Sequence, residues 1–220
     1  MRLSVPYYAQ SSEFSCGPAC ILMVMKHLDP GIRLSRALEF EVWRQCNMIG
    51  IRGADPYGLC VPLLDEGCEV CLTSRRRSAV APSAWRRHLA QSGFDPEEVR
   101  LVHFGMQENR RRALGRRLTV KHNPPTVAGI EARMREGFVP IALVHMGVVH
   151  HLDIPHWVVV TEVAERYVVF NDPYRPHGRK GIRLNHRTFQ KILDDVEVRI
   201  GMSPAVVFAR ADRKMRKLHS

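Results

Sequence analysis

Long apolar runs are missing from this sequence. No stretch approaches the roughly 18 consecutive apolar residues that a membrane span requires, so we expect no membrane span. The start of the chain, Met1 to Pro6, also lacks the apolar core of a secretion signal. These two absences predict a cytoplasmic protein whose cysteines are reduced thiols. The six cysteines are Cys16, Cys20, Cys46, Cys60, Cys68 and Cys71.

Internal repeats and low-complexity segments are also absent, which excludes a repeat array and a compositionally disordered chain. Aromatic side chains do not alternate with the basic clusters in the way that reads nucleic-acid bases, so we expect no nucleic-acid partner. Cys68 and Cys71 have no second cysteine pair nearby, so they predict two strand residues and not a zinc knuckle. We accordingly expect no cofactor and no metal.

Basic residues, in contrast, are abundant. Lys and Arg number 33 against 22 Asp and Glu, which gives a formal net charge of +11. Arginines cluster at 75–77, 110–112 and 116–117, and the tail from Arg210 to Lys217 is basic too. The simplest interpretation is a solvated basic surface. Such a field also attracts anionic partners, so an acidic peptide substrate is the alternative that we keep.

The order of sequence patterns predicts the fold class. Helical patterns dominate the first part and strands rich in valine and isoleucine follow, which favours an α+β fold with a C-terminal antiparallel sheet. The helices are expected at 19–28, 36–47, 57–66, 83–91, 96–114, 126–136 and 187–193, and the strands at 69–73, 139–146, 156–163, 167–171 and 205–210. We expect one domain over 1–220, with an arginine-rich helical insertion at about 75–125.

The sharpest local motif is Gln10, followed after five residues by Cys-Gly-Pro-Ala-Cys at 16–20. The motif places Cys16 at the start of a buried helix, where unpaired N–H groups and the helix dipole stabilise a thiolate. Gly17 lets the backbone approach a bound substrate closely. The Cys16 amide and the Gln10 side chain can jointly donate to an oxyanion. Taken alone, Cys16 is equally well explained as a small buried thiol.

A base for this thiol is predicted by a hairpin late in the chain. His156 begins a valine-rich strand, residues 164–166 form a short turn, and Asp172 ends the returning strand. In that register the His156 and Asp172 side chains lie opposite each other within about one residue, so the carboxylate can orient the imidazole. Each of these residues is ordinary taken alone, so the prediction depends on their combination with Gln10 and Cys16.

Together these segments resemble the C39-like cysteine peptidases, which are related to the domain that removes leader peptides from bacteriocin precursors. The resemblance is carried by residues 5–10, 16–20, 155–157 and 171–173, and it is weak across about 75–125. It implies a papain-like fold and hydrolysis of a peptide or protein substrate. The chain is more similar to the stand-alone members than to the domains fused to transporters.

The resemblance also implies a role for each residue of the motif. Cys16 is the expected nucleophile, His156 the base, Asp172 the residue that orients the base, and Gln10 the oxyanion-hole residue. We further expect substrate contacts from Gly17, Trp157, His151 and Asn171.

Three alternatives stay open at this point. The same acyl-enzyme can pass its acyl group to an amine, as in an acyltransferase or transpeptidase. The cleft can also hold a peptide without cutting it, which an intact nucleophile and base argue against. The segment from His145 to His156 holds four histidines and an aspartate, so a zinc enzyme is a weaker alternative to a histidine-bearing loop beside the cleft. The sequence does not fix the oligomeric state or the cleavage motif.

Overall fold

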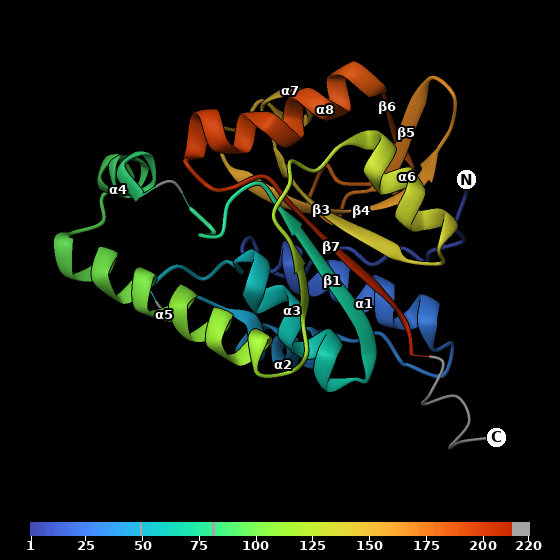
Figure 1. Cartoon of the computed structure of the whole chain (residues 1–220), viewed down its shortest axis with the longest axis horizontal. Coiled ribbons are helices and arrows are strands. Elements are labelled where there is room, and N and C mark those ends of the chain that lie inside the picture. Colours follow the sequence, from blue (N-terminus) through green and yellow to red (C-terminus); the bar gives the residue numbers. More distant parts are fainter. Residues whose placement is uncertain (49, 81, 213–220) are drawn as a thin grey trace.

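The computed structural model describes residues 1–48, 50–80 and 82–212. Its centre is a seven-stranded sheet in the order β2-β1-β7-β3-β4-β5-β6, with helices on both faces (Figure 1). The strands are β1 (Cys68–Ser74), β2 (Thr119–Lys121), β3 (Val139–His145), β4 (Pro155–Val163), β5 (Tyr167–Asn171), β6 (Ile182–Asn185) and β7 (Ala205–Ala211). All neighbouring strands are antiparallel except β1 and β2, which run parallel.

Three helices cover one face of the sheet: α1 (Cys16–Leu28), α2 (Arg36–Cys46) and α3 (Pro56–Asp65). Side-chain caps fix where two of them begin. The Ser35 hydroxyl accepts a hydrogen bond from the Leu38 N–H at the start of α2, and Asp55 caps α3 in the same way. These three helices position the predicted nucleophile, because α1 begins at Cys16.

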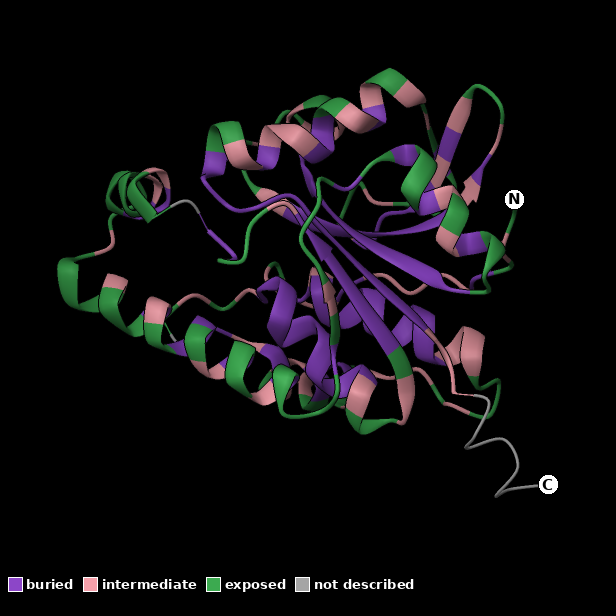
Figure 2. Cartoon of the chain, in the orientation of Figure 1, coloured by how far each residue is buried: buried purple, intermediate pink, exposed green. Residues whose placement is uncertain are grey.

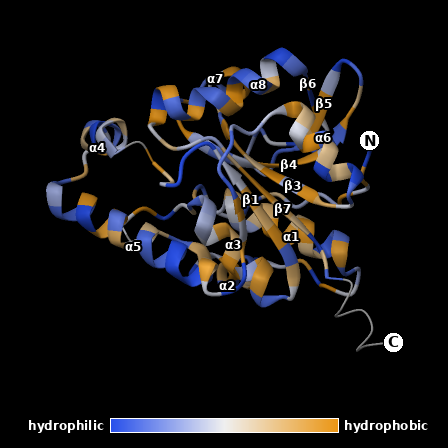
Figure 3. Ribbon diagram, in the orientation of Figure 1, coloured by the Kyte–Doolittle hydropathy of each residue, from blue (hydrophilic) through white to orange (hydrophobic). Residues whose placement is uncertain are grey.

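The opposite face is covered by α6 (Val127–Arg135) and α8 (His186–Asp195), with the short α7 (Gly147–His150) and a π-helical turn, Val196–Ile200, beside them. The strands between the two helical layers are buried and hydrophobic (Figures 2 and 3). In β3, for example, Leu143 packs into the hydrophobic core on the side of α1 and α3, and Val144 packs into the core on the side of α6 and α8. Such continuous apolar strands are expected where both faces of a sheet are covered.

The arginine-rich segment contains two helices, α4 (Pro82–Gln91) and α5 (Pro96–Leu114), and then β2. α5 packs along α3, while α4 lies at one end of the molecule between α5 and the π-helical turn (Figure 1). Asp95 and Glu98 form a capping box at the start of α5. Among the described residues, no helix is both long and apolar enough to cross a membrane.

The predicted α+β class is confirmed, and the predicted helices and strands occur close to their expected ends. The prediction of the sheet was wrong in two respects. We expected an antiparallel sheet, but β1 and β2 pair in parallel, and the strands β2 and β6 were not predicted. The helix α7 and the π-helical turn were also missed. These elements are three to five residues long, too short for a hydrophobic period to mark them.

Candidate active site

Cys16 is the first residue of α1 and is partly exposed, whereas the next nine residues, Gly17–Met25, are buried. The helix therefore leads away from Cys16 into the core, and its free N–H groups lie at the thiol end. Gly17 is required by packing, since a Cβ there would lie 2.6 Å from Leu59 Cδ1 and 3.3 Å from Trp157 Cδ1. The protein's own side chains therefore already require glycine at this position, and close approach of a substrate to it stays a prediction.

His156 lies at the start of β4, where its imidazole is hydrogen bonded to both the Cys16 thiol and the Asp172 carboxylate. The Nε2 atom of His156 is 2.8 Å from Oδ1 of Asp172. Burial opposes ionisation of the imidazole, but the charges of Cys16 and Asp172 and their hydrogen bonds outweigh it and raise the pKa of His156 to about 9. The structure therefore brings together three residues that lie up to 156 positions apart in the sequence.

The pKa of the Cys16 thiol is shifted downward, opposite to that of His156. Burial disfavours its ionised form, but the positive charge and hydrogen bond of His156 and the backbone of Trp157 and Gly17 hold its pKa below the ordinary value. Burial also raises the pKa of Asp172, but hydrogen bonds and charge from His156 dominate and lower it to about 2. The arrangement thus favours a thiolate beside an imidazolium that a carboxylate supports.

The hairpin register differs slightly from the prediction. β4 pairs with β5 so that Val159 lies opposite Asn171, and a bulge separates Val160 from Glu162. Continuing this register by one residue places Asp172 beside Val158, two residues from His156. The two side chains therefore meet diagonally across the strands, a distance that long polar side chains can span.

A second histidine, which the sequence analysis did not assign, also contacts Asp172. Nε2 of His150 lies 2.6 Å from Oδ2 of Asp172, and the His150 side chain is 7% exposed. The ring of His150 packs against Tyr174, with centroids 4.9 Å apart, and the Tyr174 N–H donates to Asp172 Oδ1. Both carboxylate oxygens of Asp172 are therefore held. Only the histidine-rich composition of the 145–156 segment hinted at this contact.

Gln10 is buried on the same side of the molecule as Asp172. Its backbone N–H donates to the Pro173 carbonyl at 2.9 Å, and its side-chain Nε2 donates to the Ser12 carbonyl at 2.8 Å. The Gln10 Oε1 atom has no hydrogen-bond partner among the described residues. Ser15 donates to the same Ser12 carbonyl, so the loop from Gln10 to Cys16 folds back on itself, as its expected role requires.

Two residues that we expected at the substrate site lie elsewhere. Asn171 is buried, and its amide donates to the Val5 carbonyl and accepts from the Gly181 N–H, so it holds the fold together. His151 is exposed, with a φ of 58°, and lines a separate hollow with Lys191. The expectation of substrate contact fails at Asn171 because a buried, fully paired amide has nothing left to offer a ligand.

Trp157 lies beside Cys16, and its contact with substrate stays a prediction. Its indole N–H donates to the Ala54 carbonyl at 2.9 Å, which fixes the ring beside Cys16. Cys16 and Trp157 line a hollow of about 260 Å³, which we call the Cys16 cavity. Leu143 of β3 contributes to it, and so does Leu89 of α4.

The histidine cluster does not form a metal site. Among the described residues, no group of three or more His, Cys, Asp or Glu side chains could hold a metal ion. His145 Nε2 lies 2.7 Å from Asp153, whereas His150 and His156 both contact Asp172. Four residues of this histidine-bearing loop, Gly147–His150, form the short helix α7, and these hydrogen bonds draw His145 and His150 inward.

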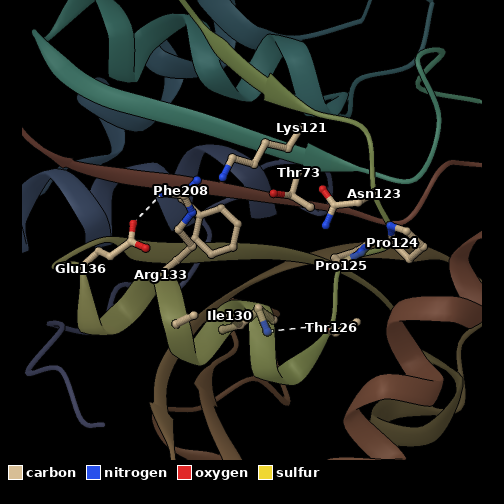
Figure 4. A pocket seen from close by; sticks show the side chains of 12 residues that line it. Thr73, Lys121, Asn123, Pro124, Pro125, Thr126, Ile130, Arg133, Glu136 and Phe208 are labelled. Carbon is tan, nitrogen blue, oxygen red and sulfur yellow. Dashed lines mark hydrogen bonds and ion pairs between the residues drawn. The ribbon is translucent and has the colours of Figure 1, made fainter.

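Another hollow, of about 230 Å³, lies on the opposite face of the sheet, beside α6 (Figure 4). Lys121 and Arg133 line it, but Arg133 is paired with Glu136 at 2.6 Å. The Gly129 N–H bonds to the Thr126 hydroxyl at its edge. This hollow is separated from Cys16 by the sheet and takes no part in the site.

Comparison with known proteins gives three results. The model of the Peptidase C39 like family matches residues 5–202. No curated protein matches significantly. Two solved structures are similar at low identity. One is a double glycine motif protease from an AMS/PCAT transporter in complex with the leader peptide (14% identity, TM-score 0.48, covering 96% of this chain and 94% of that one).

The other is the peptidase domain of Streptococcus ComA, a bi-functional ABC transporter involved in a quorum sensing pathway (13% identity, TM-score 0.46, covering 93% of this chain and 97% of that one). The family match extends over both segments that supply Cys16, His156 and Asp172. The fold is of the α+β type, with Cys16 at a helix start and His156 on the sheet. The chain therefore belongs to the Peptidase C39 like family.

Proposed function

We propose that this protein is a cysteine peptidase that hydrolyses a peptide bond through Cys16, His156 and Asp172. The observation that carries the proposal is the hydrogen-bond chain from the Cys16 thiol through His156 to Asp172. A buried pair of this kind holds a nucleophile ionised and a proton donor charged at the same pH. The opposed pKa shifts of Cys16 and His156 support it.

In the proposed reaction the Cys16 sulfur attacks the carbonyl carbon of the scissile bond, and the carbonyl oxygen becomes an oxyanion. The imidazolium of His156 gives its proton to the leaving amine as the C–N bond breaks, which leaves a thioester on Cys16. Neutral His156 then takes a proton from water, and the oxygen of that water attacks the thioester. The acid leaves, and the thiolate and imidazolium are restored.

Asp172 stays ionised throughout, because its pKa of about 2 lies far below that of His156. Its role in the proposal is to hold the imidazole in one tautomer and one orientation. The backbone N–H of Cys16 and the side-chain amide of Gln10 are the proposed oxyanion donors. Gln10 is buried and anchored to Ser12 and Pro173, so its position does not depend on substrate.

All six cysteines are free thiols, which suits the reducing cytoplasm that we propose as the protein's location. Of the five other cysteines, Cys20 and Cys60 have pKa values that burial raises well above the ordinary value. Burial raises the pKa of Cys68 as well, to about 11. Cys16 is therefore the thiol expected to react at neutral pH.

The test uses the purified chain, a peptide library and mass spectrometry of the products. The wild type should cleave library members, and Cys16→Ala should lose turnover completely while retaining its circular dichroism spectrum and melting temperature. Asp172→Ala should retain partial activity, because it does not supply the attacking atom. Cleavage that persists in Cys16→Ala would overturn the proposal. Products formed on added amines, in place of acids, would assign acyl transfer instead of hydrolysis.

A further inference from the structure

The Cys16 cavity opens directly beside the proposed nucleophile, and its walls are mainly apolar. Leu143 and Trp157 come from the sheet, Ile51 from the loop between α2 and α3, and Leu89 and Phe94 from the arginine-rich segment. Trp157 uses its only donor on Ala54, so the rest of its ring presents carbon atoms. We propose that this cavity is a subsite that selects a bulky apolar side chain, leucine or phenylalanine in type, next to the bond that Cys16 attacks.

The inference rests on the proposed peptidase function and adds the class of substrate. The cavity holds about 260 Å³, below the range of roughly 300–1,000 Å³ that encloses whole drug-sized ligands. It therefore suits a single large side chain and not a folded segment. Because Cys16 is part of its lining, the residue whose side chain occupies it must lie within a few positions of the scissile bond.

The charged residues that line the cavity do not favour a substrate side chain of either sign. Its lining includes one acidic residue, Glu13, and one Arg, Arg52, and both are exposed. The guanidinium of Arg52 lies 5.7 Å from the centre of the Phe14 ring, an orientation that stabilises its charge without a ligand. Burial lowers the pKa of His88, which favours a neutral ring there. An apolar side chain loses least on entering such a site.

The wall supplied by α4 has a local cause in the sequence. α4 ends in a turn in which Gly93 adopts a φ of +86° and the Phe94 N–H donates to the Leu89 carbonyl at 3.1 Å. This left-handed glycine turns the chain back, as at many helix ends, and brings Phe94 to the cavity next to Leu89. Gly201, which follows the π-helical turn, lets α4 pack closely against that turn. A Cβ on Gly201 would lie 2.5 Å from the Trp85 backbone nitrogen.

Burial of one leucine or phenylalanine side chain favours binding strongly enough to change rates by about tenfold or more relative to glycine. The test measures the labelling of Cys16 by tripeptidyl chloromethyl ketones. Each of the three positions is varied in turn among Gly, Leu, Phe and Asp, and the labelled residue is located by mass spectrometry. At one position, Leu and Phe should label Cys16 at least about tenfold faster than Gly and Asp.

Two variants change the size of the cavity without touching the triad. Ile51→Phe fills it, so the preference for Leu and Phe over Gly should fall to about twofold or less. Phe94→Ala removes one wall, and the preference should fall at least about threefold. Both residues are only partly buried, which limits the cost in stability. Phe104→Ala is the matched control, since Phe104 is 55% exposed on α5 and lines a different hollow.

Iodoacetamide separates this inference from the proposed function, because it needs a reactive thiol but no subsite. Phe104→Ala should react with iodoacetamide at the wild-type rate, and the melting temperature of each variant verifies its fold. The preference for Leu and Phe over Gly is a ratio of rates within one variant, so a change in the overall reactivity of Cys16 cancels. If iodoacetamide labels Cys16 but glycine is accepted as well as leucine, or if Ile51→Phe keeps the full preference, the subsite is wrong and the peptidase remains. If iodoacetamide does not label Cys16 in the wild type, the proposed function fails and the subsite fails with it.

Discussion

At the scale of single residues, the site depends on how Cys16 and His156 share a proton. Their pKa values are shifted toward each other's usual range, that of Cys16 downward and that of His156 upward to about 9. These shifts favour the charged pair of thiolate and imidazolium, and the pair is lost as pH rises and the imidazolium gives up its proton near pH 9.

This predicts the pH dependence of Cys16 alkylation. Wild-type Cys16 should react with iodoacetamide at pH values below the ordinary thiol pKa of about 8.5. Peptide cleavage should decline above about pH 9 as His156 becomes neutral. His156→Ala should move the alkylation profile upward by about 1–3 pH units, the usual effect of losing a nearby opposite charge. Rates measured from pH 5 to 10 decide this. A His156→Ala profile that coincides with the wild-type profile would contradict the ion pair.

His150 gives a second residue-scale prediction. We propose that it acts as a positioning residue, because it contacts Asp172, the residue proposed to orient His156. His150→Ala should lower kcat about tenfold with little change in KM, since one hydrogen bond to the carboxylate is lost. His150→Gln, which keeps an N–H donor, should recover part of the loss. Because the Asp172 carboxylate then has one donor fewer and attracts the His156 imidazolium more strongly, the alkaline limit of the activity should move to higher pH in His150→Ala, a shift that a purely structural defect would not produce.

At the scale of elements, the starts of two helices lie at the candidate site. α1 begins at Cys16, and α3 begins just after Ala54, which lines the Cys16 cavity, with Asp55 as its N-cap. The Asp55 side chain is fully buried and accepts hydrogen bonds from Tyr57, Gly58 and the Asn109 side chain, the last at 2.6 Å. Burial raises the pKa of Asp55 to about 6. This one carboxylate therefore ties α3 to α5 of the arginine-rich segment.

We expect Asp55→Ala to lower the free energy of unfolding by about 2 kcal/mol or more, because it removes a cap and strands the buried Asn109 donor. Asp95→Ala is the matched control. Asp95 also caps a helix that begins with proline, but it is exposed, so its loss should cost only about 1 kcal/mol. Urea unfolding of both variants measures the difference. Equal losses would show that the contact between α3 and α5 contributes nothing to stability.

At the scale of the whole molecule, the net charge is +11, and several of the arginines are paired locally with carboxylates. Arg75 lies 2.8 Å from Glu197, Arg76 is paired with the same carboxylate, and Arg116 bonds Asp65. These pairs hold the arginine-rich segment against the rest of the fold. We propose that residues 75–125 form an insertion within one domain, which covers one end of the cleft with α4. Part of the basic tail, 213–217, lies outside the described residues.

The remaining positive charge gives a prediction about substrate choice. If the basic surface attracts acidic peptides, kcat/KM for an acidic peptide should fall several-fold between about 50 mM and 500 mM salt, because salt screens long-range attraction. A neutral analogue with the same residues at the scissile bond should change little. Equal salt dependence for the two peptides would favour the simpler interpretation, in which the arginines only solvate the surface.

Local sequence determined much of this protein. The order of helices and strands, the start of α1 at Cys16 and the hairpin that joins His156 to Asp172 all follow from neighbours a few residues apart. Helix caps, proline positions and alternation act over that range, so a sequence reveals them directly. The pairing of His156 with Asp172 was predictable for the same reason, because a short turn fixes the register of a hairpin.

Only the tertiary structure decided the rest. It brought Cys16 to His156, placed His150 on the second oxygen of Asp172, and buried Asn171 away from any substrate. It also built the Cys16 cavity from six separate segments of the chain. These contacts depend on how separate elements pack, and packing is set by the shapes of whole surfaces that no local pattern records.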